Sequence, residues 1–408
     1  MPGPDGGHRD RSDRRGGGVT PHGERSVAAI ARIHSVFPMP AARSGIASIL
    51  LEFCDAVDRD AGLRRRFACT AWMSMANREA MRRYLRGAVP LPLARLLVRG
   101  RLGMEWMTRW TMRRLRAEAR AGDVVVLYPG PSPADVAALR RKGVTIVHDP
   151  VNAAFPRGRR MLERAYAAAG SPMPSGPDTA AIAHERATVA AADVVLACSP
   201  HVADSYAELG VPRERILPSS YGYNPHTFQP VRRTGARPTF LFAGTGSVRK
   251  GLPVLLAAWA RAGIDGRLLV VGRVDAEVAE RHAERMRQST VEFRPHTSDL
   301  AGVYGEADAF VLTSFEEGSP LVSYLALAAG LPCVLSPASA GWVVRDGVEG
   351  LVVEPDDVDG IARALRALAD DAALRGRLAG AAARRSADYT WDRVAQQRLA
   401  ALSPFLPR

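Results

Sequence analysis

Two short loops hold the residues of this chain that are best suited to binding an anionic ligand. The first loop, residues 244–251 (Gly-Thr-Gly-Ser-Val-Arg-Lys-Gly), follows an apolar run and contains the cationic pair Arg249 and Lys250. Glycines let backbone N–H groups approach a phosphate closely, and the two cations supply the opposite charge. Lysine is informative here because only Lys142 and Lys250 among the 55 basic residues are lysines. A lysine kept among so many arginines indicates a need for a compact point charge.

The second loop, residues 314–320 (Ser-Phe-Glu-Glu-Gly-Ser-Pro), places two adjacent carboxylates before a glycine. A carboxylate such as Glu317 accepts hydrogen bonds from hydroxyl groups. The backbone amides of Gly318 and Ser319 can reach hydroxyls or phosphate without interference from a large side chain. The two loops together predict a pocket for a ligand that carries both phosphate and hydroxyl groups.

Both loops must be held by alternating strands and helices. In the second half, apolar runs predict strands at 240–243, 268–271, 291–293, 309–313, 333–335 and 351–353. Amphipathic runs between them predict helices at 252–262, 276–287, 299–307, 321–329 and 358–369. This alternation implies a parallel sheet, and ligands bind beyond the carboxyl ends of such strands. The loops at 244–251, 272–275, 295–298 and 314–320 should therefore converge.

The first half shows the same alternation, so the fold class is α/β. Its predicted strands are 30–36, 123–127, 144–147 and 194–197, and its predicted helices are 46–57, 133–141, 157–169, 178–191 and 199–209. The proline- and glycine-rich stretch 218–235 reads as an interdomain linker. Since 408 residues exceed what one core usually supports, we expect two domains, at 27–228 and 229–388.

The composition favours a cytoplasmic protein. Four cysteines, Cys54, Cys69, Cys198 and Cys333, are scattered without the spacing of a zinc site or a disulfide framework. No apolar stretch is long enough to span a bilayer, and residues 1–26 lack the apolar middle of a signal peptide. Residues 1–26 are rich in Gly, Arg, Asp and Pro, so we expect a disordered tail there.

The formal charge of +13 is concentrated in residues 59–120, which hold sixteen arginines against four carboxylates. Methionines, leucines and tryptophans alternate with these arginines in a helix-like order, so we expect a basic helical segment. One interpretation is an amphipathic surface that contacts anionic lipid at the inner face of the membrane. Another is a set of ordinary helices whose arginines face water. No nucleic acid is expected as a partner, because the chain carries no nucleic-acid-binding signature.

Residues 180–395 resemble the retaining glycosyltransferases of the GT-B fold, family 4, also called glycosyl transferases group 1. The matching pieces occur in the family's order: 192–195 with Ser199, 210–212 with Ile216, 221–228, 249–251, 291–293, 307–312, 317–318, 329–332 and 346–350. Residues 1–180 match only loosely, through 37–45 and 147–149. The resemblance implies two Rossmann-like, doubly wound domains that face each other across a cleft. It also implies that residues 389–408 form a helix that packs back on the N-terminal domain.

The resemblance implies transfer of a sugar from a nucleotide diphosphate sugar to a hydroxyl acceptor, with retention of configuration and without a metal or a cofactor. Arg249 and Lys250 would grip the diphosphate, and Glu317 would lie over the donor sugar. His148, after the strand 144–147, would touch the sugar or acceptor near the reacting carbon, unless it only caps that strand. The residues implied for the donor site are Gly244, Thr245, Gly246, Arg249, Lys250, Glu317, Gly318, Ser319, Pro320 and Leu321. Candidates for acceptor contact are Gly45, His34 and Asp149.

The chain departs from the family's pattern at two positions. The family's second glutamate, which receives the ribose hydroxyls, is replaced by Leu325, and Thr245 stands where an arginine is common. Ser323 or Tyr324 could take over the glutamate's role, the donor could be unusual, or the site could have decayed. Two other functions therefore stay open: a non-catalytic GT-B protein that binds a partner, and a nucleotide-sugar epimerase.

Two further motifs resemble functional sites but have simpler explanations. Residues 356–359 (Asp-Asp-Val-Asp) look like a metal motif, yet they begin a predicted helix, where Asp is a normal cap. Residues 184–186 (His-Glu-Arg) could suggest acid–base chemistry, but Glu185 lies on a helical run and we expect a surface or interdomain position.

Overall fold

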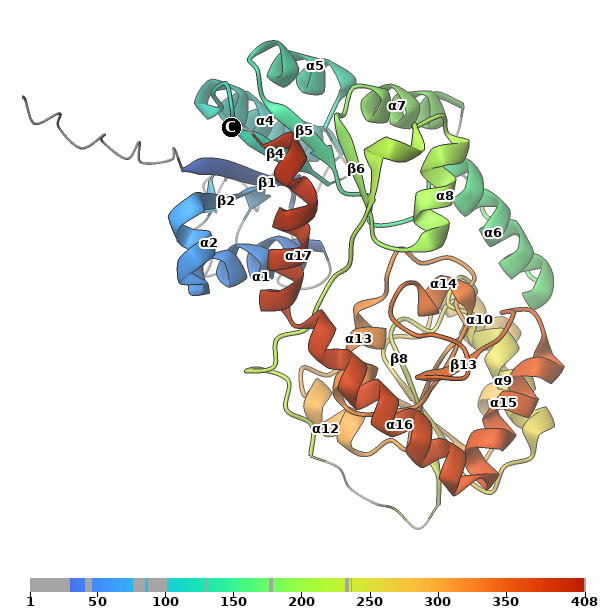
Figure 1. Ribbon diagram of the computed structural model, residues 1–408. Helices are drawn as coiled ribbons and strands as arrows, with labels where there is room; N and C mark the ends of the chain where they lie inside the picture. Colours follow the sequence, from blue (N-terminus) through green and yellow to red (C-terminus); the bar gives the residue numbers. More distant parts are fainter. Residues whose placement is uncertain are drawn as a thin grey trace, which may run out of the picture.

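The computed structural model describes residues 30–40, 46–75, 85–86, 101–128, 131–175, 179–231, 235 and 237–406. These residues form two α/β domains, one built on each of two parallel sheets (Figure 1). The expected tail at 1–26 and the candidate residue Gly45 lie outside the described residues. Among the helices that the structure describes, none has the length and apolar character needed to cross a bilayer.

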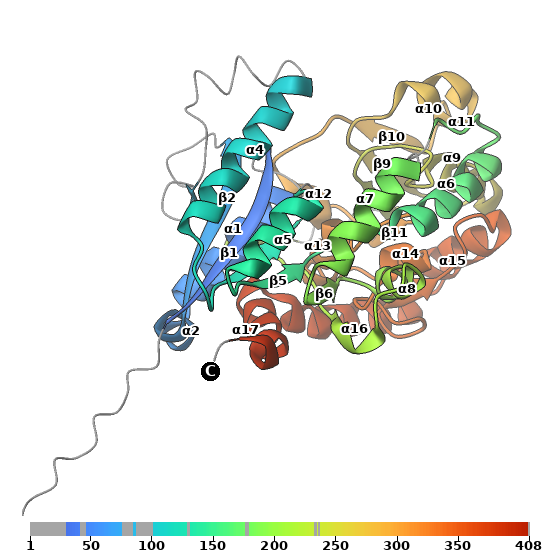
Figure 2. The same cartoon turned by 90° about the horizontal axis from the view of Figure 1, so that it is seen from above.

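The first sheet has seven parallel strands in the order β3-β2-β1-β4-β5-β6-β7. The strands are β1 (Ala31–Pro40), β2 (Phe67–Met75), β3 (Leu85–Arg86), β4 (Val124–Leu127), β5 (Thr145–His148), β6 (Val194–Ala197) and β7 (Ile216–Pro218). The helices are α1 (Ile46–Arg59), α2 (Ala61–Arg66), α4 (Arg101–Glu118), α5 (Pro133–Arg141), α6 (Phe155–Ala169), α7 (Thr179–Ala190) and α8 (Pro200–Glu208). Alternate residues of β4 enter different cores: Val124 and Val126 join the core that contains α1, and Val125 and Leu127 join the core under α4 and α5 (Figure 2).

The prediction of a basic helical segment over 59–120 is wrong in part. Residues 67–75 form β2, which pairs in parallel with β1, and only α2 and α4 are helical in the described part of this segment. Residues 67–75 form a strand and not a helix because the apolar side chains of this stretch are buried, whereas the arginines lie before and after it. The buried residues are Phe67, Ala71, Trp72 and Met73. The start of the predicted linker is also ordered, because residues 216–218 form the edge strand β7 beside β6.

The second sheet contains all six predicted strands: β8 (Thr239–Ala243), β9 (Arg267–Val271), β10 (Val291–Arg294), β11 (Ala309–Leu312), β12 (Cys333–Leu335) and β13 (Gly350–Val352). Its helices are α9 (Leu252–Ala262), α10 (Ala276–Arg281), α11 (Ala283–Met286), α12 (Leu300–Gly305), α13 (Leu321–Ala328), α14 (Pro337–Ala340), α15 (Val358–Asp370) and α16 (Ala372–Ser386). The single helix predicted at 276–287 is two short helices, because the backbone leaves helical geometry at His282. Helix α16 follows Asp371 and was not predicted from the sequence.

Both sheets have the strand order of a doubly wound Rossmann fold. In the second sheet the order β10-β9-β8-β11-β12-β13 reverses between β8 and β11, and in the first sheet the order reverses between β1 and β4. Ligands of such sheets bind beyond the carboxyl ends of the strands at this reversal. The loops that follow β8 and β11 are 244–251 and 313–320, the two loops in which the sequence places its cations and carboxylates.

The chain crosses between the domains twice, and the two crossings lie side by side. Tyr223 pairs with Thr390, and Trp391 donates its backbone N–H to the carbonyl of Tyr223 (3.0 Å). The final helix, α17 (Trp391–Leu402), then packs on α1 of the first domain (Figure 1). A buried ion pair anchors this helix, because Arg398 of α17 contacts Asp149, the residue after β5.

We expect Arg398→Met to lower the free energy of unfolding by about 3 to 5 kcal/mol, because it leaves the Asp149 carboxylate buried without its partner. The matched control is Arg59→Ala, which breaks the exposed Arg59–Asp392 pair between α1 and the same helix. That change should cost less than about 1 kcal/mol. Urea unfolding of both variants checks this, and equal losses would contradict a dominant role for the buried pair.

Candidate functional site

The two loops predicted to converge are joined directly at the carboxyl edge of the second sheet. The backbone N–H of Phe315 donates to the carbonyl of Arg249 (2.9 Å). Gly251 has a positive φ of 73°, and a Cβ at this position would lie 2.2 Å from the carbonyl oxygen of Thr313. Only glycine permits both this conformation and this close approach. The glycine-rich turn therefore brings Arg249 and Lys250 to the loop that carries the glutamates.

Two cations and two carboxylates form one cluster in this place. Lys250 pairs with Glu317, which also accepts a hydrogen bond from Ser314 Oγ (3.1 Å). The Arg249 guanidinium donates to the backbone carbonyl of Glu316 (2.7 Å) and lies 3.3 and 3.4 Å from the carboxylates of Glu316 and Glu317. The site thus holds two positive charges that carboxylates neutralise while no ligand is bound.

The two glutamates differ in pKa because they differ in partners. Burial by itself would raise the pKa of Glu317, but the charges of Lys250 and Arg249 outweigh it and hold that pKa below its ordinary value. Burial raises the pKa of Glu316, and Arg249 offsets this only in part. The cations therefore favour the ionised form of Glu317 more strongly than that of Glu316.

The glutamate loop also touches the first domain. Gly318 packs so tightly on the segment after β5 that an added Cβ would lie 1.8 Å from the carbonyl oxygen of Val151. Asn152 donates to the Glu316 carboxylate (3.3 Å), and His201 of α8 donates through Nε2 to the backbone carbonyl of Glu317. Sequence reasoning missed His201, although its position just after β6 at the carboxyl edge of the first sheet could have indicated it.

His148 is the last residue of β5 and lies three residues before Val151, where the chain meets the glutamate loop. Its ring is buried, and burial lowers its pKa to about 4, so the imidazole is neutral at neutral pH. Its Nε2 lies 3.3 Å from the hydroxyl of Tyr206, which in turn lies 3.2 Å from the Glu185 carboxylate. The expectation of a surface or interdomain position for Glu185 misses these contacts within the first domain.

The two described acceptor candidates make structural contacts instead. His34 is buried within β1, where it contacts Thr70 (2.7 Å) and Asp123 (3.2 Å) near the beginning of β4. That end of the sheet is opposite to the carboxyl edge, so the structure does not bring His34 to the site. Asp149 is fully buried against Arg398, which makes it an anchor of α17 and corrects its assignment to acceptor contact.

The helix after the glutamate loop shows what surrounds Leu325. Leu325 lies in α13, half-buried and packed on the apolar core together with Leu321. Tyr324 is fully buried, with its hydroxyl 2.6 Å from Ser319 Oγ and in contact with the backbone N–H of Tyr221 (3.1 Å). Ser323 Oγ donates to the carbonyl of Ser339 (3.1 Å). Both polar neighbours are thus engaged in buried contacts within the protein.

The remaining residues that the sequence implied for a donor site lie in the two loops. Gly244 has a positive φ of 139° and lies beside the Lys250 side chain, and Gly246 donates its N–H to the carbonyl of Arg273 (2.8 Å). Thr245 is half-buried between them, and Pro320 begins α13 on the other loop. The acidic stretch 356–359 caps a helix, because Asp357 accepts from the N–H of Gly360 (2.8 Å).

Comparison with known proteins identifies the domain that carries this cluster. Residues 237–371 match the family model described as glycosyl transferases group 1. The second domain is a group 1 glycosyl transferase domain. A D-inositol 3-phosphate glycosyltransferase from Streptomyces avermitilis is 31% identical to the chain over 287 residues, which cover 63% of this chain and 60% of the relative. The chain spans 60, 56 and 63% of the length of three curated relatives of this name.

Solved structures show that the group 1 domain is part of a complete GT-B fold. Sucrose-phosphate synthase from Thermosynechococcus elongatus has a TM-score of 0.71 at 20% identity, covering 92% of this chain and 99% of that one. The HepE protein from Anabaena, solved in complex with UDP, has a TM-score of 0.66 at 14% identity, covering 92% of this chain and all of that one. The chain has the GT-B fold, as the sequence predicted.

We expect Gly318→Ala to weaken the contact between the glutamate loop and the first domain, because its Cβ would overlap the Val151 carbonyl of that domain. Overpacking of about 1 to 3 kcal/mol would disfavour this contact by roughly 5- to 150-fold. Small-angle X-ray scattering should then report a larger radius of gyration. Gly376→Ala is the control, since an added Cβ on α16 meets no atom within 4 Å. Identical scattering from both variants would contradict the expectation.

Proposed function

We propose that the protein is a glycosyltransferase that moves a sugar from a nucleoside diphosphate sugar to a hydroxyl group. The observation that carries this proposal is the paired charge cluster at the reversal of strand order in the group 1 domain. Arg249 and Lys250 lie where a diphosphate would bind, and Glu317 lies in the same cluster, where hydroxyl groups of the sugar could reach it. HepE binds UDP and UDP-glucose on the same fold, which supports uridine diphosphate sugars as the first donors to test.

In the proposed reaction the acceptor oxygen forms a bond to the anomeric carbon while the bond from that carbon to the diphosphate oxygen breaks. The electron pair of the broken bond remains on the diphosphate, where Arg249 and Lys250 stabilise the growing negative charge. Fixed donors of this kind typically contribute about 3 to 4 kcal/mol to lowering the barrier. The acceptor proton passes to the departing phosphate oxygen on the same face of the sugar, which retains the configuration. No metal takes part in this scheme.

The same cluster explains how Arg249 and Lys250 are stabilised before the donor binds. A buried lysine or arginine without a partner is costly, and Glu316 and Glu317 remove that cost before the donor binds. An incoming diphosphate would displace the two carboxylates and bind the two cations in their place. Glu317, freed from Lys250 but still held by Ser314, would then accept hydrogen bonds from hydroxyl groups of the sugar.

Leu325 favours one other function, a GT-B protein that binds a ligand or partner without turnover. The carboxylate that would receive the ribose hydroxyls is absent at this position, and Ser323 and Tyr324 are engaged in buried contacts within the protein. Losing charged hydrogen bonds of this kind would cost about 1.5 to 3 kcal/mol each in donor binding. Measured turnover of a nucleotide sugar separates the two functions, and product analysis separates transfer from epimerisation.

We expect Lys250→Ala to abolish thermal stabilisation by nucleotide diphosphates. In a screen against UDP, GDP, ADP, dTDP and their sugars, the wild-type protein should be stabilised by one base, because ligands that bind only the folded state raise its apparent stability. Arg261→Ala is the control, since Arg261 is exposed at the far end of α9 and pairs with Asp359. Stabilisation that survives in Lys250→Ala, or that fails for every nucleotide in the wild type, would refute the proposed donor site.

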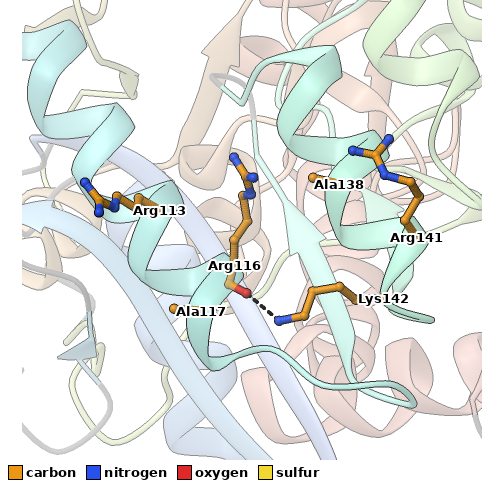
Figure 3. A pocket seen from close by; sticks show the side chains of 6 residues that line it. All are labelled: Arg113, Arg116, Ala117, Ala138, Arg141 and Lys142. Carbon is orange, nitrogen blue, oxygen red and sulfur yellow. Dashed lines mark hydrogen bonds between the residues drawn. The ribbon is translucent and has the colours of Figure 1, made fainter.

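We also propose that the first domain associates peripherally with an anionic membrane surface. A groove of about 590 Å³ lies between α4 and α5, lined by Arg113, Arg116, Ala117, Ala138, Arg141 and Lys142. Figure 3 shows Arg116 between the two helices, with Arg113 on one side and Arg141 on the other. Within the described part of the chain, Arg113 and Arg141 have no ion pair with a carboxylate. Trp106, 42% exposed on the same helix as Arg113, adds an aromatic side chain of the kind found at membrane interfaces.

Charge reversal in the groove tests this association. We expect the double variant Arg113→Glu, Arg141→Glu to lose more than about tenfold in binding to phosphatidylglycerol vesicles, since each basic residue near an anionic surface contributes about 1 kcal/mol. Arg363→Glu combined with Arg366→Glu is the control, because both residues are exposed on α15 of the other domain and the charge change is the same. Equal loss in both variants, or equal binding of the wild type to phosphatidylcholine vesicles, would contradict a specific surface.

A further inference from the structure

A chain of three polar side chains leads from the carboxyl edge of the first sheet into the first domain. His148 at the end of β5 contacts the hydroxyl of Tyr206 on α8 (3.3 Å), and that hydroxyl contacts the carboxylate of Glu185 on α7 (3.2 Å). The other Glu185 oxygen accepts from the backbone N–H of Phe155 at the start of α6 (2.8 Å). Tyr206 is 3% exposed and His148 is 6% exposed, so water has little access to the contact between them.

The hydrogen bonds along this chain determine which ring nitrogen of His148 carries the proton. Burial raises the pKa of Glu185, while the N–H of Phe155 and the hydroxyl of Tyr206 favour its ionised form. The geometry has Tyr206 donating its single hydroxyl proton to Glu185, which as a carboxylate only accepts hydrogen bonds. The Tyr206 oxygen can then only accept from His148, which places a proton on Nε2. The imidazole is neutral, because burial lowers its pKa to about 4. Its other nitrogen, Nδ1, therefore carries a lone pair and no proton.

Nδ1 of His148 is buried and has no hydrogen-bond partner. A buried acceptor left unpaired costs roughly 1 to 3 kcal/mol, and in a native structure it calls for an explanation. Val151 and Asn152, three and four residues after His148, contact the glutamate loop of the opposite domain. The ring thus lies close in sequence to the contact between the domains, and a ligand bound there can supply the partner that Nδ1 lacks.

We propose that Glu185 and Tyr206 are positioning residues that hold His148 with its proton on Nε2, so that Nδ1 accepts a hydrogen bond from a hydroxyl group of the bound substrate. This inference rests on the proposed function, which supplies a hydroxyl-rich substrate between the two domains. Without Tyr206 and Glu185 the ring would populate both neutral forms. The form with a proton on Nδ1 would face the substrate hydroxyl as a donor instead of an acceptor.

Nitrogen-15 NMR of histidine-labelled protein tests the proton position without a ligand. The two neutral forms of imidazole differ in their nitrogen shifts and in their couplings to ring protons. The signals of His148 are assigned by their loss in His148→Asn. We expect wild-type protein to carry the proton on Nε2 and Tyr206→Phe to show a mixture of forms. Tyr304→Phe is the control. It also removes the hydroxyl of a buried tyrosine, but this tyrosine lies in the second domain, where it donates to the carbonyl of Val322. A proton on Nδ1 in the wild type, or an unchanged His148 in Tyr206→Phe, would overturn the proposal.

Kinetics test the role of this form in substrate binding. With a nucleotide sugar that the wild type turns over, Tyr206→Phe should lower kcat/KM about tenfold and Tyr304→Phe should leave it nearly unchanged. His148→Asn, whose amide oxygen can occupy the position of Nδ1, should retain more activity than His148→Gln. Equal activity of Tyr206→Phe and wild type would refute the positioning role. Absence of any turnover in the wild type would instead refute the proposed function, while the NMR result would still decide the proton position.

Discussion

The ion pair between Lys250 and Glu317 is the interaction on which the candidate site depends. It joins the loop after β8 to the loop after β11, the two central strands of the second sheet. Each partner makes the burial of the other tolerable, because an unpaired charge in this position would lose more hydration than the protein could replace. The pair also sets the electrostatic condition for a ligand: only an anion that satisfies both cations at least as well as the carboxylates do can displace them.

The same loop couples the site to the arrangement of the domains. Gly318, Glu316 and the carbonyl of Glu317 all contact the first domain, through Val151, Asn152 and His201. The returning helix α17 is fixed to the same segment of the first domain by the pair of Arg398 and Asp149. Because Asp149 directly follows His148, the anchor of the returning helix and the candidate substrate contact share one stretch of backbone. The anchor of α17 therefore helps to fix the backbone position of His148.

The sequence was sufficient for the second sheet because most of its strands are short, mainly apolar runs, although β10 also carries Glu292 and Arg294. It was insufficient for β2, where buried Trp72 and Met73 lie between arginine-rich stretches and the strand is recognised only by its pairing with β1. The cation and carboxylate loops could be predicted because their charged residues directly follow apolar runs that are recognisable as strands. His201 and Glu185 were missed because their partners, the Glu317 carbonyl and the Tyr206 hydroxyl, come from other elements, and no local pattern encodes such contacts. His34 and Asp149 were misassigned for the same reason, since their buried partners are distant in sequence.

Leu325 shows how the site can depart from the family pattern while the fold is kept. A leucine at this point of α13 packs half-buried on the apolar core, so the helix gains apolar burial where the family has a carboxylate. In the proposed complex the ribose would then have no charged acceptor, and the cations at Arg249 and Lys250 would carry a larger share of donor binding. Such a site would draw more of its donor binding from the diphosphate than from the ribose. Its choice among nucleotides would then depend on contacts to the base, and its choice among sugars on groups near Glu317 and His148.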